Sequence, residues 1–444
     1  MARRRHVIVG GGTAAINAIT TIRELDGGDS EIVLVADERP YSRMVLPYYL
    51  AGKIGRSHVM TLGAPRLAAF GVLTTHLGRR AVSLDASAQR VALDDGASVD
   101  YDDLLVATGS SPAPPSVPGI DGPGVRPFWT LPQADALVGE LRPGCEVVMV
   151  GAGFIAFTIL NALVRRGAKL TLLEIAPTVL PQMLDATGAR IVTDWLLRHG
   201  VGVRTGARLE GIEQVEGRRR LLLHGGERLA ADAVIVATGI RPNLGWLRGS
   251  GIAIGQGILV DDRLRSSAAN VYAAGDVAEG LDRVTGARAV HAIEPAAMEH
   301  GRIAGANMAG LDRIYAGTVA VNIVDALDLE VASFGAWNER GAESVAAEKA
   351  APRGYRRLVF RGGGERLTGA IVVGMSRDLW ATNDVGMLKG LVQSGAPLGA
   401  WKALLRRDPW EIKRAFVANG TVGRLLPETV LGRPSLPADA VTAS

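Results

Sequence analysis

The chain has 444 residues, of which 48% are hydrophobic and 21% charged, a balance typical of a globular protein of two or three domains and not of a disordered chain. The net charge is +4, and the basic residues form no stripe interleaved with aromatic residues. We therefore expect no nucleic-acid binding. No apolar run reaches the roughly 18 residues of a membrane span and the start lacks a signal-peptide pattern, so we expect a cytoplasmic protein without a membrane span.

The first predicted elements form a βαβ unit. A short β-branched strand, Val7–Val9, leads into a glycine-rich turn at residues 10–15. A helical pattern follows, in which isoleucines recur at three-residue spacing, and a second strand covers Ile32–Val35. A strand, a glycine turn, a helix and a strand in this order predict a dinucleotide-binding site.

Gly10, Gly12 and Ala15 occupy the three positions of the dinucleotide fingerprint. The first glycine permits a tight turn, the second lets the backbone approach a pyrophosphate, and the alanine allows close helix–strand contact. The amides at the helix start would then bind the pyrophosphate. An acidic side chain after the second strand would accept a ribose hydroxyl, and we place Glu38 first and Asp37 second for this role.

Further along, Cys145 is the only cysteine of the chain. A single thiol excludes an intramolecular disulfide, a dithiol redox pair and a four-thiolate iron–sulfur or zinc site, and we expect no metal site. Because Cys145 directly precedes a strand-like run, we interpret it as a small buried hydrophobe.

The fingerprint then recurs. The strand Val147–Val150 leads into Gly151, Gly153 and Ala156, and a helix and the strand Lys169–Leu173 follow. Two complete fingerprints in one chain are hard to explain by chance. The sequence therefore predicts a second dinucleotide site.

Glu174 ends the second strand of this second unit. A carboxylate there accepts the 2′-hydroxyl of NADH and repels the 2′-phosphate of NADPH. No arginine follows in the stretch Ile175–Pro177, and we interpret Arg165 and Arg166 as a solvated helix end. We therefore expect NADH to be preferred over NADPH.

Three further segments contain strand ends where the backbone can pass close to a nucleotide. The residues of interest in them are Ala107, Thr108 and Gly109 in the stretch 103–112, Thr238 and Gly239 in the stretch 232–243, and Gly275 and Asp276 in the stretch 270–277. In this order, the five motifs resemble the two-dinucleotide-binding flavoprotein family. That family includes the ferredoxin and rubredoxin reductases, the flavin domain of NADH-dependent nitrite reductase and the pyridine nucleotide–disulfide oxidoreductases.

The resemblance implies an α/β fold with two Rossmann-like dinucleotide-binding domains, one for FAD and one for NAD, plus a smaller α+β C-terminal domain. We expect a discontinuous FAD-binding domain at residues 1–117 and 247–317, an NAD(P)-binding domain at 118–246, and a C-terminal interface domain at 318–444 with a mobile tail. The resemblance also implies that Asp276 hydrogen-bonds the ribityl chain of FAD.

Two segments resemble parts of the family that lie near the flavin. The stretch 40–48 matches a segment in which an arginine, here Arg43, lies near the isoalloxazine ring, although a surface salt bridge is the alternative. The stretch 294–301 resembles a helix whose start faces the flavin pyrimidine edge, where Glu294, Pro295 and Ala296 would lie. His291 could approach the ring as well, but a satisfied loop histidine is at least as plausible.

The chain also departs from the family. The disulfide-reducing branch of the family carries its reactive cysteine near the helix that follows the first βαβ unit. In this chain the stretch 42–48 contains no cysteine, which excludes a mechanism in which a thiol relays the electrons. Ferredoxin reductases commonly carry a lysine where this chain has Tyr48. Thr158 stands where family members usually place a glutamate near the nicotinamide–flavin contact, so either hydride transfer tolerates the change or the nicotinamide site is weakened. The candidate catalytic side chains are thus Arg43, Tyr48, Thr158 and Glu294.

The glycine motifs stop at about residue 318. Strands are predicted at Val331–Gly335, Tyr355–Phe360 and Leu367–Val373, and a helical region at Asp384–Ala418. The basic side chains of that region suit either a partner-docking surface or a packed helix with a solvated face. The tail after Pro427 is expected to be mobile.

These features support three hypotheses. The first is an NADH-dependent reductase, in which hydride passes from NADH to FAD N5 and electrons then reach a separate acceptor such as a ferredoxin- or rubredoxin-type carrier. The second is the FAD-binding subunit of a heteromeric dehydrogenase that oxidises an amine or a small acid. The third is a non-catalytic flavin-binding sensor or scaffold. A homodimer or a partner subunit is expected.

Overall fold

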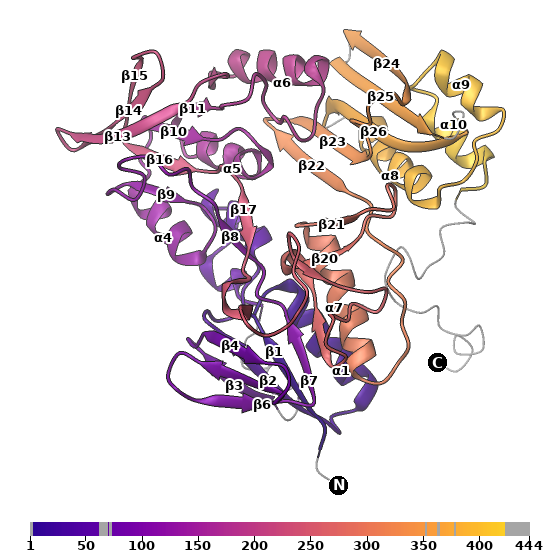
Figure 1. Ribbon diagram of the computed structural model, residues 1–444. Helices are drawn as coiled ribbons and strands as arrows, with labels where there is room; N and C mark the ends of the chain where they lie inside the picture. Colours follow the sequence, from indigo (N-terminus) through magenta and orange to yellow (C-terminus); the bar gives the residue numbers. More distant parts are fainter. Residues whose placement is uncertain are drawn as a thin grey trace. The chain divides into compact units, whose positions relative to one another are not determined.

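The computed structural model describes residues 3–61, 70, 73–350, 353–361, 365–376 and 379–421 (Figure 1). The chain divides into two compact units. The larger unit consists of the chain up to Leu281, Arg288–Gly317 and Val324–Leu327. The smaller unit consists of Asp282–Ala287, Thr318–Ile323 and the chain from Asp328 onward. In the described ranges, no helix is long and apolar enough to cross a membrane. The predicted mobile tail after Pro427 lies outside the described residues.

The first sheet of the larger unit is parallel and has the strand order β19-β7-β1-β2-β3. Its strands are β1 (Arg5–Val9), β2 (Glu31–Ala36), β3 (Leu73–Leu77), β7 (Asp103–Val106) and β19 (Val271–Ala273). Helix α1 (Thr13–Asp26) connects β1 to β2 as predicted. Because β19 pairs with β7, a segment far along the chain completes the N-terminal sheet.

A second parallel sheet repeats this arrangement with the order β12-β11-β10-β16-β9. Its strands are β9 (Val125–Pro127), β10 (Glu146–Val150), β11 (Lys169–Leu173), β12 (Gly202–Arg204) and β16 (Ala233–Val236). Helices α5 (Phe154–Arg165) and α6 (Ala186–Arg198) form its crossovers, and α4 (Leu131–Glu140) precedes β10. The two predicted Rossmann-like cores are confirmed, and Cys145 before β10 is half-buried, not buried as expected.

The two cores also share an insertion. A three-stranded antiparallel sheet separates β3 from β7 in the first core, and another separates β12 from β16 in the second. These sheets consist of β4 (Ala81–Asp85), β5 (Arg90–Leu93) and β6 (Ser98–Asp100), and of β13 (Leu209–Val215), β14 (Arg218–Leu223) and β15 (Arg228–Ala231). The predicted boundaries between FAD and NAD(P) domains fall within the larger unit and stay a prediction.

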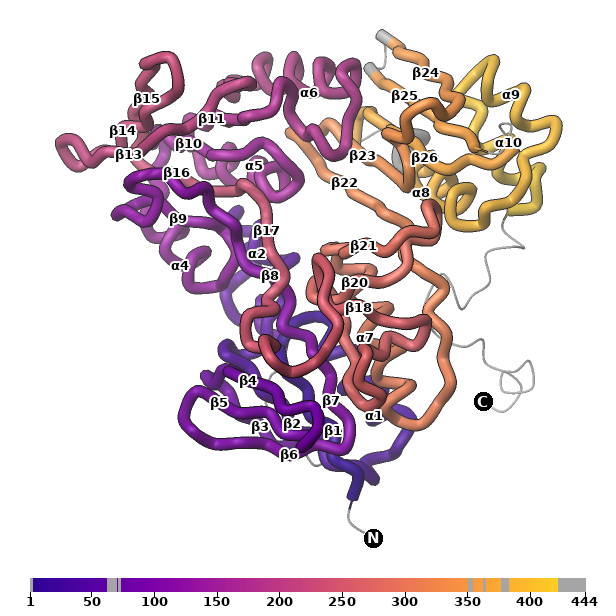
Figure 2. Tube along the Cα trace, viewed as in Figure 1, coloured from indigo at the N-terminus to yellow at the C-terminus, as the bar shows by residue number. Residues whose placement is uncertain are grey.

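A two-stranded link joins the cores. Strand β8 (Ser110–Pro112) follows β7, and β17 (Ile240–Pro242) follows β16; the two pair antiparallel between the parallel sheets (Figure 2). The polypeptide therefore leaves each sheet through its Ala-Thr-Gly segment and enters the link directly after it. The two segments are brought together although about 130 residues of chain separate them.

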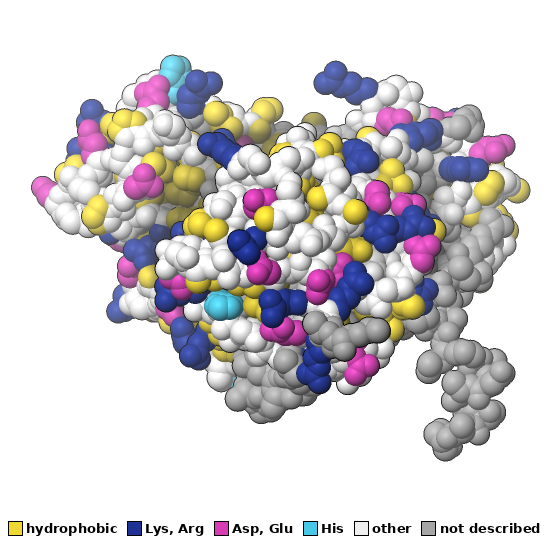
Figure 3. Space-filling view, turned by 60° about the horizontal axis from the view of Figure 1, so that its bottom comes forward, with side chains coloured by type: hydrophobic (Ala, Val, Ile, Leu, Met, Phe, Trp, Pro, Cys, Tyr) yellow, Lys and Arg dark blue, Asp and Glu magenta, His cyan; other side chains and the backbone are white. Residues whose placement is uncertain are grey.

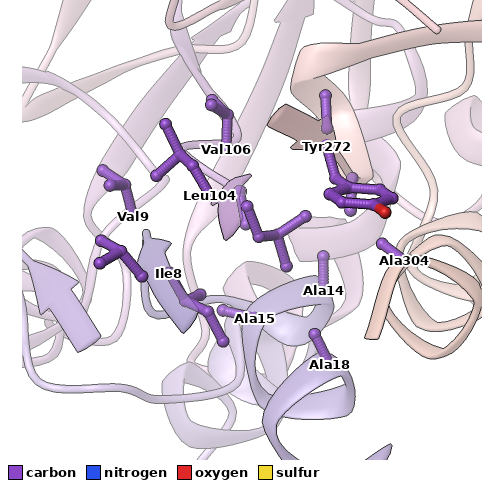
Figure 4. Packing of buried hydrophobic residues seen from close by; sticks show 14 of the residues in the cluster. Ile8, Val9, Ala14, Ala15, Ala18, Leu104, Val106, Tyr272 and Ala304 are labelled. Atoms are coloured by element: carbon purple, nitrogen blue, oxygen red, sulfur yellow. The ribbon is translucent and has the colours of Figure 1, made fainter. Parts of the chain in front are cut away.

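Helix α7 (Glu294–Met308) packs against α1 through small residues. A Cβ atom built on Gly301 would lie 2.2 Å from the carbonyl oxygen of Ala14, and one on Gly305 would lie 2.7 Å from that of Ala18. Figure 4 shows Ala14 and Ala18 of α1 near Ala304 of α7 within the apolar core of the first sheet. Backbone-to-backbone contact at this crossing therefore requires glycine.

The smaller unit is an α+β structure with the sheet order β22-β23-β26-β25-β24. The strands of this sheet are β22 (Val321–Ala326), of which Val321–Ile323 belong to this unit, β23 (Leu329–Gly335), β24 (Glu343–Ala350), β25 (Arg353–Arg361) and β26 (Arg366–Met375). The predicted helical region consists of α8 (Leu379–Ser394), α9 (Trp401–Arg407) and α10 (Ile412–Ala418). Pro397 and Pro409 lie in the two breaks, where proline removes a backbone donor and interrupts the helix.

Candidate functional site

The two predicted glycine turns are built alike. Gly10 has φ +116° and Gly151 has φ +101°, conformations that favour glycine. A Cβ on Gly10 would lie 2.0 Å from the carbonyl oxygen of Ala107, and a Cβ on Gly151 would lie 2.3 Å from that of Ala237. The alanine of each Ala-Thr-Gly segment thus occupies the space that a side chain on the glycine would need.

The helix that follows each turn begins beside open space. Gly12 precedes α1 and Gly153 precedes α5, and a Cβ built on either has no described atom within 4 Å. The first amides of a helix have no partner inside that helix, and the helix dipole is positive there. Both turns therefore fit the diphosphate of a dinucleotide.

A cavity of about 500 Å³ extends from the first turn. The predicted residues in its wall are Gly10, Gly12, Asp37, Arg43, Ala107, Thr108, Gly109, Thr158, Gly275, Asp276 and Glu294. These residues come from both parallel cores and from α7. The structure therefore brings together most of the side chains predicted for the flavin site.

Other predicted residues lie outside this wall. They are Ala15, Glu38, Tyr48, Pro295 and Ala296, and the second-site residues Gly151, Gly153, Ala156, Glu174, Thr238 and Gly239. Ala15 and Ala296 are buried in helix packing, which agrees with the close-contact role expected of the former. The Tyr48 side chain is 52% exposed, and Lys53 Nζ lies 5.7 Å from the centre of its ring.

Asp276 lines the cavity from the turn after β19. Gly275 takes φ +77° there, and Ser110 Oγ donates a hydrogen bond of 2.6 Å to Asp276 Oδ2. Burial raises the pKa of the Asp276 carboxyl, an effect that the Ser110 bond and the charge of Arg43 partly offset. A carboxyl held in a cavity wall in this way is a suitable acceptor for sugar hydroxyls.

Arg43 reaches the cavity between two aromatic rings. Its guanidinium carbon lies 5.9 Å from the centre of the Tyr41 ring and 5.5 Å from that of Trp129. Arg43 Nη2 also lies 3.7 Å from Glu38 Oε2. Asp37, the second choice for the ribose acid, lies in the cavity wall, with its Oδ2 atom 3.5 Å from Arg80 Nε, whereas Glu38, the first choice, lies outside the wall.

Glu294 is the first residue of α7 and lines the cavity. Thr13 Oγ1, at the start of α1, donates a hydrogen bond of 3.3 Å to Glu294 Oε1. Burial raises the pKa of the Glu294 carboxyl, and the Thr13 bond opposes this effect. The starts of α1 and α7 thus meet at one point of the cavity.

Glu174 is held at the second glycine turn. Its carboxylate accepts hydrogen bonds from the amide of Ala152, at 2.7 Å, and from that of Ala176, at 2.9 Å. The side chain is buried at the end of β11. A carboxylate anchored to the turn has acceptor capacity left for a ribose hydroxyl of a dinucleotide bound there.

The start of α5 reaches the cavity of the first core. Phe154, Ile155 and Thr158 all lie in the cavity wall. Thr158 Oγ1 donates a hydrogen bond of 2.7 Å to the carbonyl oxygen of Ile155, so this hydroxyl is satisfied within its own helix. A nucleotide bound at the second turn would therefore lie at the start of α5, whose first residues border the cavity of the first core.

Sequence reasoning missed several polar groups around the cavity. Asn243 Nδ2 donates to the Thr108 carbonyl oxygen at 2.8 Å, and Ser111 Oγ donates to Asn243 Oδ1 at 2.8 Å, which fastens the two-stranded link. Trp129 Nε1 donates to the Ser110 carbonyl oxygen at 2.9 Å. The Asn and Ser residues adjoin the Ala-Thr-Gly segments, which was a usable signal, whereas Trp129 had none.

Comparison with known proteins agrees with this geometry. Residues 4–294 match the family model described as pyridine nucleotide-disulphide oxidoreductase. The chain is 32% identical over 426 residues to the NADH-dependent phenylglyoxylate dehydrogenase subunit epsilon of Aromatoleum evansii, covering 95% of this chain and 96% of that one. It is 31% identical to the NADH oxidase of Methanocaldococcus jannaschii, over 74% of this chain and 76% of that one.

Solved structures show the same fold. An NAD-dependent persulfide reductase from A. fulgidus matches with a TM-score of 0.84 and 28% identity, over 95% of this chain and 84% of that one. The covalent complex of putidaredoxin reductase with putidaredoxin matches with a TM-score of 0.81 over 95% of this chain and 100% of the matched chain, at 23% identity, which supports the fold alone.

Proposed function

The chain belongs to the pyridine nucleotide-disulphide oxidoreductase family, and on that premise we propose that it is an FAD-dependent oxidoreductase that takes electrons from NADH and passes them to a separate acceptor. The observation that carries the proposal is the composition of the cavity wall. Its first glycine turn belongs to one core, and Phe154, Ile155 and Thr158 belong to the helix of the other. Two nucleotides bound at the two turns would therefore meet in one cavity.

The residues present fit FAD. Gly10 allows the tight turn, Gly12 leaves open space for the diphosphate, and Asp37 and Asp276 would accept hydroxyls of the ribose and of the ribityl chain. The positive end of α7 would favour negative charge nearby. Bound FAD would supply two-electron and one-electron chemistry that side chains lack. The protein's part is to bind, orient and exclude water, which requires no catalytic thiol.

Glu174 supports NADH as the electron donor. Its carboxylate is fixed at the second turn, where a ribose 2′-phosphate would meet a negative charge. Ile175 directly after it is 62% exposed and offers no cation for such a phosphate.

The acceptor that we propose is a ferredoxin- or rubredoxin-type carrier, and a homodimer or partner subunit is part of the same proposal. On the face shown in Figure 3, Lys and Arg side chains lie among Asp and Glu side chains and form no area of a single sign. A carrier that docks on this face would therefore meet local charge pairs and not a broad basic surface.

A second function has a specific observation in its favour. The relative from Aromatoleum evansii is named as a subunit of an NADH-dependent dehydrogenase, and the match runs over 95% of this chain. This favours our alternative of an FAD-binding subunit in a heteromeric dehydrogenase that oxidises an amine or a small acid. The relatives named above are oxidoreductases or their subunits, which disfavours the non-catalytic sensor or scaffold.

An anaerobic titration of the purified protein with NADH and NADPH tests the proposal. We expect micromolar NADH to bleach the flavin absorbance and NADPH to do so only at higher concentration. A flavin that stays oxidised with both nucleotides would contradict the reductase function. Reduction by a small acid only when a co-purifying second subunit is present would instead establish the heteromeric dehydrogenase.

A further inference from the structure

His300 lies on α7 beside the turn that carries Asp276, and none of the roles above involves it. Its imidazole is buried, and its Nδ1 atom accepts a hydrogen bond of 3.3 Å from the amide of Gly275. Burial, together with the neighbouring His291, lowers the pKa of His300 to about 3. The ring is therefore neutral at physiological pH.

The hydrogen bond also determines the tautomer. Because Nδ1 accepts from an amide, the single proton of the neutral ring lies on Nε2. In the described part of the chain, Nε2 has no hydrogen-bond partner. The ring instead meets Tyr315 at a centroid distance of 4.8 Å and an interplanar angle of 87°, an edge-to-face arrangement that suits an N–H donor and a ring face.

The turn that His300 contacts has little freedom of its own. Gly275 has φ +77°, and a Cβ built on it would lie 3.3 Å from the Cβ of Ala14 and 3.6 Å from that of Ala297. Asp276 follows directly, and its carboxylate faces the cavity while accepting from Ser110. The Gly275 amide is thus the point at which α7 holds the backbone of this turn.

We propose that His300 is a positioning residue for the flavin site: as a neutral Nε2–H imidazole, it holds the Gly275 amide and so sets the position of the Asp276 carboxylate. His300 is not part of the cavity wall, so it would act through the turn and not by contact with the cofactor. The inference rests on the proposed FAD site and deepens it, since it names the group that orders the ribityl-binding carboxylate. The helix that carries His300, α7, also places Glu294 on the cavity wall.

Two substitutions separate the hydrogen bond from the volume of the side chain. His300→Asn places an acceptor oxygen near the position of Nδ1, whereas His300→Leu keeps an apolar side chain without an acceptor. The probe is FAD itself, titrated into the apoprotein and followed by quenching of flavin fluorescence. We expect His300→Leu to weaken FAD binding about fivefold to tenfold, the effect of one hydrogen bond, and His300→Asn to stay within about twofold of wild type.

A double-mutant cycle with Asp276→Asn distinguishes positioning from general helix packing. If His300 acts through the Asp276 carboxylate, His300→Leu loses most of its effect in the Asp276→Asn background. An equal fold-loss in both backgrounds, or no loss in the wild-type background, would overturn the inference. Failure of wild-type apoprotein to bind FAD would instead refute the proposed function, so the two failures are distinguishable.

The tautomer is directly measurable in the intact protein. In a sample labelled with ¹⁵N-histidine, with the signals assigned by comparison with His300→Asn, we expect the neutral Nε2–H pattern for His300, unchanged between pH 5 and 9. A signal that titrates in this range, or the opposite tautomer, would contradict the proposed hydrogen bond.

Discussion

At the scale of single residues, each proposed nucleotide site contains a carboxylate that already accepts a hydrogen bond from a neighbouring donor. Asp276 accepts from Ser110, and Glu174 accepts from the amides of Ala152 and Ala176. Such contacts fix a side chain before a ligand binds, which reduces the entropy that binding costs. The roles of these residues are therefore separable by substitutions that keep the local hydrogen bond and change only the charge.

The first prediction concerns the nucleotide preference. Glu174→Ala combined with Ile175→Arg removes the ribose acceptor and adds a cation at an exposed position. A charge-assisted hydrogen bond contributes about 1.5–3 kcal/mol, so we expect the ratio of kcat/KM for NADH to that for NADPH to fall roughly tenfold to a hundredfold. Steady-state reduction of a dye acceptor by each nucleotide measures this ratio. Glu174→Gln, which keeps an acceptor for Ala152, is the matched control, and an unchanged ratio in the double variant would refute the assignment.

The second prediction follows from the buried carboxyl of Asp276. Because burial raises its pKa, the folded protein holds this proton more tightly than the unfolded chain, so the ionised group opposes folding above its folded pKa. This cost disappears as the pH falls below the unfolded value of about 4.

Asp276→Asn should therefore raise the thermal midpoint of the apoprotein at pH 7–8, on the order of 1–3 °C, with a difference that shrinks toward pH 4. The same variant should bind FAD more weakly, as expected where a functional group lowers stability. Differential scanning fluorimetry across pH tests this, and an apoprotein that loses stability at neutral pH would contradict it.

At the scale of elements, the crossing of α1 and α7 determines where two helix starts lie. Gly301 and Gly305 let the helix backbones touch, and the bond from Thr13 to Glu294 joins their first turns. The start of α1 is also the proposed diphosphate site. Packing at the crossing and binding at the cavity are therefore linked through one rigid helix pair.

The third prediction tests this link. Gly301→Ala places a methyl group 2.2 Å from a backbone oxygen, and such overpacking costs about 1–3 kcal/mol. We expect a lower free energy of unfolding and weaker FAD binding, measured by denaturant titration and flavin fluorescence. Gly139→Ala is the control, because Gly139 is also helical but has open space around it. Equal effects of the two substitutions would refute the role of the crossing.

At the scale of the whole molecule, the larger unit contains two copies of one architecture joined by β8 and β17. Asn243 donates a hydrogen bond to the Thr108 carbonyl oxygen across this link, so the two cores are joined next to their Ala-Thr-Gly segments. The smaller unit has a separate core around β23, β26 and α8. Ligands of the cavity should thus stabilise the larger unit specifically.

The fourth prediction uses this division. FAD at a hundred times its Kd should stabilise the folded larger unit by about 2.7 kcal/mol, because the ligand binds only the folded cavity. In calorimetry, added FAD should raise the transition of the larger unit and leave that of the smaller unit in place. Limited proteolysis with mass spectrometry assigns the transitions. A shift confined to the smaller unit would refute the placement of the FAD site.

Much of this protein was readable from local sequence. The glycine turns at Gly10 and Gly151 each have a positive φ and no room for a Cβ atom, so glycine is the suitable residue there. Each turn also lies in a short strand–turn–helix pattern, which is recognisable in the local sequence. The strand Lys169–Leu173 was predicted with the bounds that β11 has, and the α+β character of the smaller unit was implied by the family resemblance. The five motifs in their order also sufficed to predict the family.

Only the tertiary structure decided which side chains share the cavity. It brought Thr158 of α5 to the first site, placed Tyr48 outside the wall, and engaged Glu38 with Arg43. These outcomes depend on contacts between segments up to more than a hundred residues apart, and such contacts arise from the packing of whole helices and sheets, which no local pattern encodes. The sequence therefore determined the two nucleotide turns, and the fold determined that α5, the helix after the second turn, borders the cavity of the first turn.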